Sequence, residues 1–218
     1  MQLGSEGSIE PSCLRSAGPP LPHEEQARAD LYGLLARLLL APPDDALLDS
    51  LAGADAILAS DAEQPLERAW HELSLVARLL PFELVRDEFN DLFVSTSIAR
   101  VSPYGSLYLA GFLHEKPLVA LRTDLAGLGL GRRIGAGETE DHLGALCETM
   151  RRLIVGGHDV ERQQQFFEMH IAPWTAACLH HLRHAEGAQF YQRVADLAGA
   201  LFDIEREAFQ VAEDYADD

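Results

Sequence analysis

Lysine is almost absent from this sequence, and basic residues are scarce overall. The 218-residue chain has 17 lysines and arginines against 35 aspartates and glutamates, which gives a formal net charge of −18. Lys116 is the only lysine. Binding to phosphate backbones depends on clustered lysine and arginine, so we expect no nucleic-acid partner. A strongly negative surface instead attracts cationic peptides, and we expect a basic partner.

Cysteines are few, and long apolar runs are missing. Cys13, Cys147 and Cys178 lie far apart with no Cys-x-x-Cys spacing. The last two fall on apolar helix faces, which predicts buried free thiols. No apolar run approaches the length needed to span a bilayer, and the first 23 residues contain no apolar core of a secretory signal. We therefore expect a cytoplasmic protein without stable membrane insertion.

Motifs of common catalytic and metal sites are missing as well. There is no Gly-x-x-x-x-Gly-Lys-Ser/Thr loop and no His-Glu-x-x-His. None of the nine histidines has a glutamate three residues before it, as a di-iron bundle requires. His180, His181 and His184 could place two imidazoles on one helix face, but the sequence around them does not match the spacing of a known zinc site. We expect no cofactor, no metal and no catalytic residue.

Helical periodicity, by contrast, is abundant. Apolar residues recur at three- and four-residue steps, and prolines or glycines end most of these runs. No alternating strand pattern and no internal repeat is present. The pattern predicts helices over residues 24–41, 44–51, 65–80, 82–94, 117–128, 138–155, 159–171 with a restart at Pro173, and 188–212. We expect a disordered segment over residues 1–22, a single all-α, bundle-like domain over 23–213, and an acidic tail over 214–218.

The stretch from Gly137 to Met150 is the most informative part of the chain. Glu138, Glu140 and Asp141 are predicted in the first turn of a helix, where acids complement the helix dipole. His142 follows at the edge of the apolar stripe. Such a start is either a well-capped helix or a pocket for a cationic guest, and the residues alone leave both open.

Two polar residues and two tryptophans lie within apolar stripes. Glu88 is either a solvated edge residue or a buried acid with a partner. His170, between Phe166 and Trp174, is expected to be a hydrogen-bonded core residue. Trp174 is likewise expected in the core, as is Trp70.

Three short segments carry motifs that can be compared with a known family. Glu88–Val94 followed by Ser102–Leu109 matches the pattern E-x-x-x-L-F-x … P-x-x-S-x-Y. Glu138–Leu143 is similar to the signature E-P-x-D-H, and Phe166–Trp174 to a third block, F-x-x-x-H-x-x-x-W. Together, over about residues 24–210, they resemble the TorD/DmsD family of redox enzyme maturation chaperones. Thr139 stands where that family commonly has proline.

The resemblance implies an all-α protein without catalysis of its own. Members bind the twin-arginine signal peptide and the body of a molybdoenzyme catalytic subunit precursor. They hold that subunit in the cytoplasm, assist cofactor insertion and delay export until the subunit is mature. The resemblance leaves a monomer and a homodimer equally open.

The expected site combines acids with an apolar groove, because a twin-arginine signal has a cationic start and an apolar stretch. Asp141 is expected to contact a guanidinium, and His142 to hydrogen-bond at the groove. A loop that faces these two residues is expected from Pro103, Tyr104, Ser106 and Tyr108. Glu138 and Glu140 are expected to surround the site with negative charge. The predicted signal-peptide site consists of Pro103, Tyr104, Ser106, Tyr108, Glu138, Glu140, Asp141, His142 and Leu143.

Two other functions are compatible with the sequence. One is a small hydrolase or GTPase that pairs Asp141 with His142 and uses Ser106 or Ser97 as nucleophile. Neighbouring helical residues point about 100° apart, and no Gly-x-Ser-x-Gly turn supports a nucleophile. The other is a non-catalytic helical adaptor for a different basic protein.

Overall fold

The computed structural model describes residues 21–55, 64–94, 99–113, 116–131 and 137–216, with side chains up to Ala212. Within these ranges the chain is helical, with one isolated antiparallel bridge and no strand. The elements are α1 (His23–Leu40), α2 (Asp45–Ala52), α3 (Pro65–Leu79), α4 (Phe82–Phe89), the π-helical turn η1 (Asn90–Val94), α5 (Gly105–Ala110), α6 (Lys116–Gly127), α7 (Leu143–Val155), α8 (Val160–His170), α9 (Ala172–His184) and α10 (Phe190–Ala216). The all-α prediction is confirmed.

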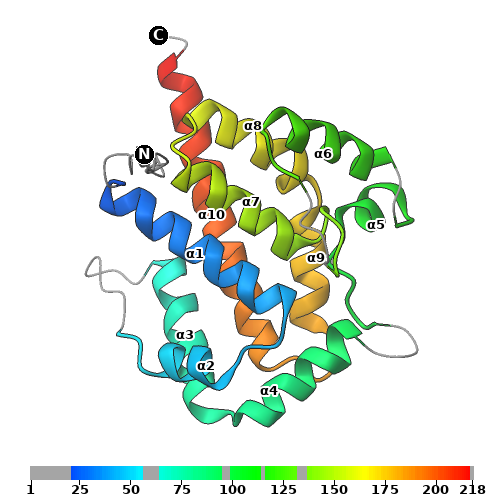
Figure 1. The fold of residues 1–218 in the computed structure, drawn as a ribbon. Coiled ribbons are helices and arrows are strands. Elements are labelled where there is room, and N and C mark those ends of the chain that lie inside the picture. Colours follow the sequence, from blue (N-terminus) through cyan, green and yellow to red (C-terminus); the bar gives the residue numbers. More distant parts are fainter. Residues whose placement is uncertain (1–20, 56–63, 95–98, 114–115, 132–136, 217–218) are drawn as a thin grey trace, which may run out of the picture.

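Helix α10 runs through the centre of the molecule, and the other helices are arranged around it (Figure 1). Its inner face, from Phe190 to Leu201, is almost fully buried. Helices α3 and α9 pack against it, and α1 lies against α7. No helix of the described ranges is both long and apolar enough to cross a bilayer.

The contact between α1 and α7 is close because α7 has a glycine in its first turn. A β-carbon at Gly144 would lie 2.8 Å from Leu40 Cγ and 3.2 Å from Leu39 Cβ. The apolar stripe of α7 enters the core as predicted: Leu143, Leu146, Cys147, Met150, Leu153 and Ile154 are all buried. The end of α1 therefore lies directly against the start of α7, next to the predicted site.

Glu88 is a partly buried acid with three backbone partners. Its carboxylate accepts the N–H groups of Gln189, Phe190 and Tyr191 at 2.8–3.1 Å. These are the first, otherwise unpaired donors of α10. The sequence left open whether Glu88 is a solvated edge residue or a buried acid with a partner. The structure shows an acid with partners, whose side chain caps the central helix.

Three boundary predictions differ from the structure. Helix α7 begins at Leu143, so Glu138, Glu140 and Asp141 lie in the loop before it and not in its first turn. Ser106 and Tyr108, predicted in a loop, lie on the short helix α5. The central helix continues to Ala216, into the predicted acidic tail.

The remaining expectations for the core and the termini have mixed outcomes. Trp174 is buried, whereas Trp70 is only partly buried, with its indole N–H donated to the Asp55 carbonyl at 3.1 Å. Cys147 and Cys178 are buried free thiols, as predicted. Residues 1–20 of the predicted disordered segment, with Cys13, lie outside the described residues, as do Ser97 and residues 217–218.

Candidate functional site

A short backbone bridge joins the segment before α5 to the segment before α7. Tyr104 and His142 pair in antiparallel fashion. The Gly105 N–H donates to the Asp141 carbonyl at 2.9 Å, and the Leu143 N–H donates to the Pro103 carbonyl at 2.8 Å. The segment that contains the expected facing loop therefore lies against the acidic segment before α7.

Asp141 directs its carboxylate into this junction. Oδ2 accepts the Ser106 hydroxyl at 2.5 Å and the Ser106 N–H at 3.0 Å, and Oδ1 accepts the Thr139 hydroxyl at 2.6 Å. Only 3% of Asp141 is exposed. Burial raises the pKa of Asp141, but these hydrogen bonds to the charged form outweigh it and leave the pKa below its ordinary value. Asp141 thus stabilises the loop as a buried carboxylate.

His142 caps α7. Its Nδ1 accepts the Gly144 N–H at 3.1 Å, which requires the neutral imidazole with its hydrogen on Nε2. The side chain is buried, and this burial lowers the pKa of His142 to about 4. The Tyr104 ring meets the imidazole edge-on, with centroids 5.0 Å apart. His142 therefore carries no charge at neutral pH.

The two glutamates of the loop are more accessible than Asp141. Glu138 accepts the Tyr104 hydroxyl, and burial together with this acid raises the pKa of Tyr104. Glu140 Oε2 accepts both Nε and Nη2 of Arg122, at 3.1 and 2.9 Å. The accessible negative charge of the predicted site therefore comes from these two glutamates.

Beside them lies a cavity of about 510 Å³, which we call the acidic cavity. Carboxylates and leucines line it together: Glu138, Glu140, Glu148, Leu40, Leu125 and Leu130. Among the lining residues that the structure describes, Arg152 is the basic one. Carboxylates beside an apolar wall are the combination that a peptide with arginines followed by apolar residues requires.

The other predicted site residues support the junction without lining the acidic cavity. Pro103 and Leu143 are buried, and Ser106 is fully buried. Tyr108 stacks on Trp174, with centroids 5.5 Å apart, and its hydroxyl lies 3.2 Å from His181 Nδ1. Of the nine predicted residues, Glu138 and Glu140 are therefore the ones that line the cavity.

The wall that α7 and α1 contribute to the acidic cavity was not predicted from the sequence. Ala145, Glu148, Thr149 and Arg152 recur at three- and four-residue steps, so this face of α7 could have been found from the periodicity. Leu40 had no comparable signal. It reaches the cavity only because α1 packs closely against Gly144.

The hydrolase alternative finds little support in this geometry. Ser106 donates its hydroxyl hydrogen to Asp141, and His142 Nδ1 accepts a backbone hydrogen. Both side chains are buried in structural hydrogen bonds. A serine nucleophile needs its hydrogen directed to the base that removes it, and here the hydrogen is directed to the carboxylate.

Comparison with known proteins agrees with the fold and the resemblance, and the class of protein is that of the redox enzyme maturation chaperones. The family model described as nitrate reductase delta subunit matches residues 59–180, more than half of the chain. The chain belongs to this family, which is of the TorD/DmsD type.

One solved structure has a similar fold. It is described as "a putative redox enzyme maturation protein" from Archaeoglobus fulgidus, with 17% sequence identity and a TM-score of 0.53. The match covers 87% of this chain and 98% of the other. No protein with a curated description matches the sequence significantly.

Proposed function

We propose that this maturation chaperone binds the twin-arginine signal peptide and the apo form of a molybdenum-containing oxidoreductase subunit. It acts in the cytoplasm, as a monomer or homodimer, assists cofactor insertion and delays export until the subunit is mature. The function is binding and not catalysis. The supporting class, a redox enzyme maturation chaperone, follows from the family and the fold.

The acidic cavity is the observation that carries this proposal. It places Glu138, Glu140 and Glu148 around a space that is also lined by leucines. A guanidinium that enters can form charge-assisted, two-pronged bonds with a carboxylate, which are stronger than neutral hydrogen bonds. Apolar residues next to the arginines gain from contact with the leucines.

Within the proposed site, the roles are divided by burial. Glu138 and Glu140 contact the guest's arginines directly. Asp141 and His142 act as positioning residues, because their polar atoms hold Ser106, Thr139 and the first turn of α7. The direct contact between Asp141 and a guanidinium, expected from the sequence, is replaced in this proposal by that positioning role.

Calorimetric titration with two peptides tests the proposal. The first peptide carries an Arg-Arg pair followed by an apolar run, and the second has both arginines changed to lysine. We expect the first to bind at least several-fold more tightly, because lysine cannot form the two-pronged bond. We expect Glu140→Gln to remove most of this difference, whereas Glu72→Gln, a matched change on α3, leaves it intact.

Two results would count against the proposal. Equal binding of the arginine and lysine peptides would indicate a general adaptor for basic proteins. Hydrolysis of an ester or of GTP by the purified protein, abolished by His142→Ala, would indicate the enzyme.

A further inference from the structure

Large apolar side chains are exposed where α5 is followed by α6. Phe112 is 72% exposed and Val119 is 62% exposed, and Leu109 and Leu113 are exposed as well. Helices α5 and α6 pack against each other, and Figure 1 shows them side by side at one edge of the molecule. Together the four side chains expose apolar surface on the order of 400 Å². We call this surface the α5–α6 face.

The inner side of α5 is attached to the rest of the protein. Ser106 is fully buried in its hydrogen bond to Asp141. Tyr108 stacks on Trp174 of α9, and its hydroxyl lies 3.2 Å from His181 Nδ1. These contacts hold α5 in one orientation, with the apolar residues that follow Tyr108 on the outside. A surface that is ordered in advance loses little conformational freedom when it meets a partner.

The segments that carry and flank this face contain almost no acid. Residues 99–113 and 171–185, which include α5 and α9, have no aspartate or glutamate, although 35 of the 218 residues are acidic. On α6, Asp124 is paired with His170 at 2.8 Å, and Lys116 is exposed at the start of the helix. Glu115 lies outside the described residues. The described part of the face is therefore free of unpaired negative charge, in a chain with a net charge of −18.

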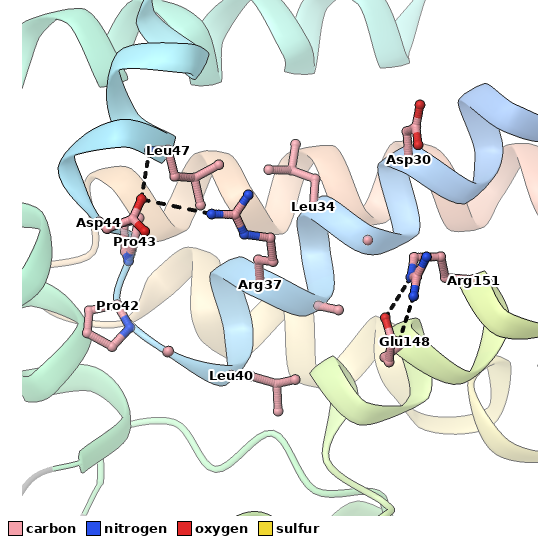
Figure 2. Close-up of a pocket in the computed structure, with 13 residues that line it drawn as sticks. Asp30, Leu34, Arg37, Leu40, Pro42, Pro43, Asp44, Leu47, Glu148 and Arg151 are labelled. Carbon is pink, nitrogen blue, oxygen red and sulfur yellow. Dashed lines mark hydrogen bonds and ion pairs between the residues drawn. The ribbon is translucent and has the colours of Figure 1, made fainter. Parts of the chain in front are cut away.

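Two other surfaces with exposed or cavity-lining leucines differ in this respect. The hollow along α1 has a volume of about 710 Å³ and contains two ion pairs, Arg37–Asp44 and Arg151–Glu148 (Figure 2). A partner that covered this hollow would have to remove water from both pairs, which is costly. Helix α4 and η1, with the exposed Leu84, contain four acids and one arginine. An uncharged apolar contact is therefore offered by the α5–α6 face and not by these two surfaces.

We propose that the α5–α6 face is the contact between two copies of this chain in a two-fold symmetric dimer. In such a dimer the same surface of each protomer meets itself, so any acids on it would be brought close to their own copies. Repulsion between charges falls off over about 8 Å at physiological ionic strength. Two strongly acidic molecules therefore approach each other most favourably where acids are absent. This inference goes beyond the proposed function and does not depend on it.

The size of the face suits a weak, reversible dimer. A standard interface buries about 800 Å² of each partner, of which about 57% is apolar. The exposed apolar area of the face, roughly 400 Å², is close to that share. We expect a dissociation constant in the micromolar range. Val119 lies in the first half of α6, whereas Leu125 in its second half lines the acidic cavity, so different parts of α6 form the dimer contact and the cavity.

Sedimentation velocity of the full chain at several protein concentrations, without any peptide, tests the dimer. We expect a monomer–dimer equilibrium that shifts towards the dimer as the salt concentration rises from about 0.05 to about 0.5 M, because screening reduces the repulsion between the two acidic molecules. Binding of the arginine peptide depends on attraction between opposite charges and should weaken over the same range. The salt response therefore separates the two kinds of contact.

Two matched pairs of variants locate the contact. Val119→Glu places an acid on the face of both protomers, and we expect it to raise the dissociation constant roughly thirtyfold. Val211→Glu makes the same change at a valine that is 54% exposed on α10 and should raise it less than about threefold. Phe112→Gln should weaken the dimer roughly tenfold, whereas Leu79→Gln, at a leucine that is 69% exposed on α3, should leave it unchanged.

Several results would overturn this inference. One is a protein that remains monomeric up to a concentration of about 1 mM, where a micromolar dimer would be almost complete. Another is a dimer that dissociates as salt is added, or one that Val119→Glu and Val211→Glu weaken equally. Loss of arginine-peptide binding in Phe112→Gln, with unchanged sedimentation, would assign the face to the peptide instead. Because the dimer is measured without peptide, failure of the arginine peptide to bind would overturn the proposed function alone.

Discussion

The Ser106 hydroxyl and the Asp141 carboxylate are joined by a 2.5 Å hydrogen bond, and both side chains are buried. The same carboxylate oxygen accepts the Ser106 N–H, and the other oxygen accepts the Thr139 hydroxyl. One acid thus connects the first turn of α5 to the loop before α7. The shape of the acidic cavity depends on that loop, because Glu138, Thr139 and Glu140 line it.

We expect Ser106→Ala to lower the free energy of unfolding by about 1–3 kcal/mol, because a buried carboxylate loses a donor. Urea denaturation followed by circular dichroism measures the change. Ser50→Ala removes an exposed hydroxyl that bonds within α2 and should shift the free energy by less than about 0.5 kcal/mol. Similar decreases in the free energy of unfolding of the two variants would show that the buried hydrogen bond to Asp141 contributes no more to stability than the exposed one.

The second prediction concerns the pH dependence of stability. His142 has a pKa of about 4 in the folded protein, against an ordinary value of 6.5. Between these values the unfolded chain binds a proton that the folded protein does not, so stability decreases as the pH falls from 6.5 towards 4. The full contribution is on the order of 3 kcal/mol. Below this window, protonation of Asp141, whose pKa is lowered, removes further stability as the pH falls through its folded value.

His142→Asn separates this contribution from the others. Asparagine is a good N-cap and does not titrate. We expect the variant to lose stability less steeply than the natural protein between pH 6.5 and 4, with free energies measured by denaturation at several pH values. Parallel curves for the two proteins would mean that His142 is not the group responsible.

Much of the fold could be predicted from the sequence because the helices bury regular apolar stripes. The stripe of α7 is an example, with every predicted position from Leu143 to Ile154 in the core. The start of α7 could not be predicted in this way. Acids are favourable in a first turn, but His142 occupies the capping position, and Asp141 finds stronger partners in Ser106 and Thr139.

Tyr104 and His142, which stand in two of the family motifs, lie side by side in the structure. Most of the residues that line the acidic cavity were not predicted from the sequence. Which acid faces outward depends on hydrogen bonds between segments about 35 positions apart in the sequence, and periodicity carries no information about these. The α1 wall was unpredictable for the same reason, since Leu40 reaches the acidic cavity through a contact between α1 and α7.

A third prediction follows from Arg122, whose guanidinium already forms an ion pair with the Glu140 carboxylate. Two of its nitrogens bond to one carboxylate oxygen, although 48% of the arginine side chain and only 12% of the glutamate side chain are exposed. A guest arginine must displace this resident guanidinium. We therefore expect Arg122→Gln to tighten binding of the arginine peptide roughly two- to fivefold, as measured by calorimetry.

The control for this prediction is Arg206→Gln. Arg206 pairs with Asp203 on α10, so its loss changes the net charge equally and leaves the Arg122–Glu140 pair in place. We expect no more than a small, salt-sensitive increase in affinity from this variant. An equal increase in both variants would mean that overall charge, and not competition at Glu140, determines the effect.

The last prediction concerns Gly144, where a single methyl group should disturb the contact between α1 and α7 beside the acidic cavity. A β-carbon there would lie 2.8 Å from Leu40 Cγ and 3.2 Å from the buried Leu39. Leu39 has no room to move, so Leu40, which is partly exposed, must turn away. Overpacking of this kind costs about 1–3 kcal/mol, which exceeds the gain of at most about 1 kcal/mol from replacing a helical glycine.

We therefore expect Gly144→Ala to lower both the stability and the affinity for the arginine peptide, although no polar group is changed. Gly127→Ala is the matched control, since a β-carbon at Gly127 meets no atom within 4 Å. It should be neutral or slightly stabilising in thermal unfolding and unchanged in binding. A Gly144→Ala protein that is less stable but binds the arginine peptide normally would show that Leu40 is not part of the binding surface, because the displacement of Leu40 is the step that links the glycine to the acidic cavity.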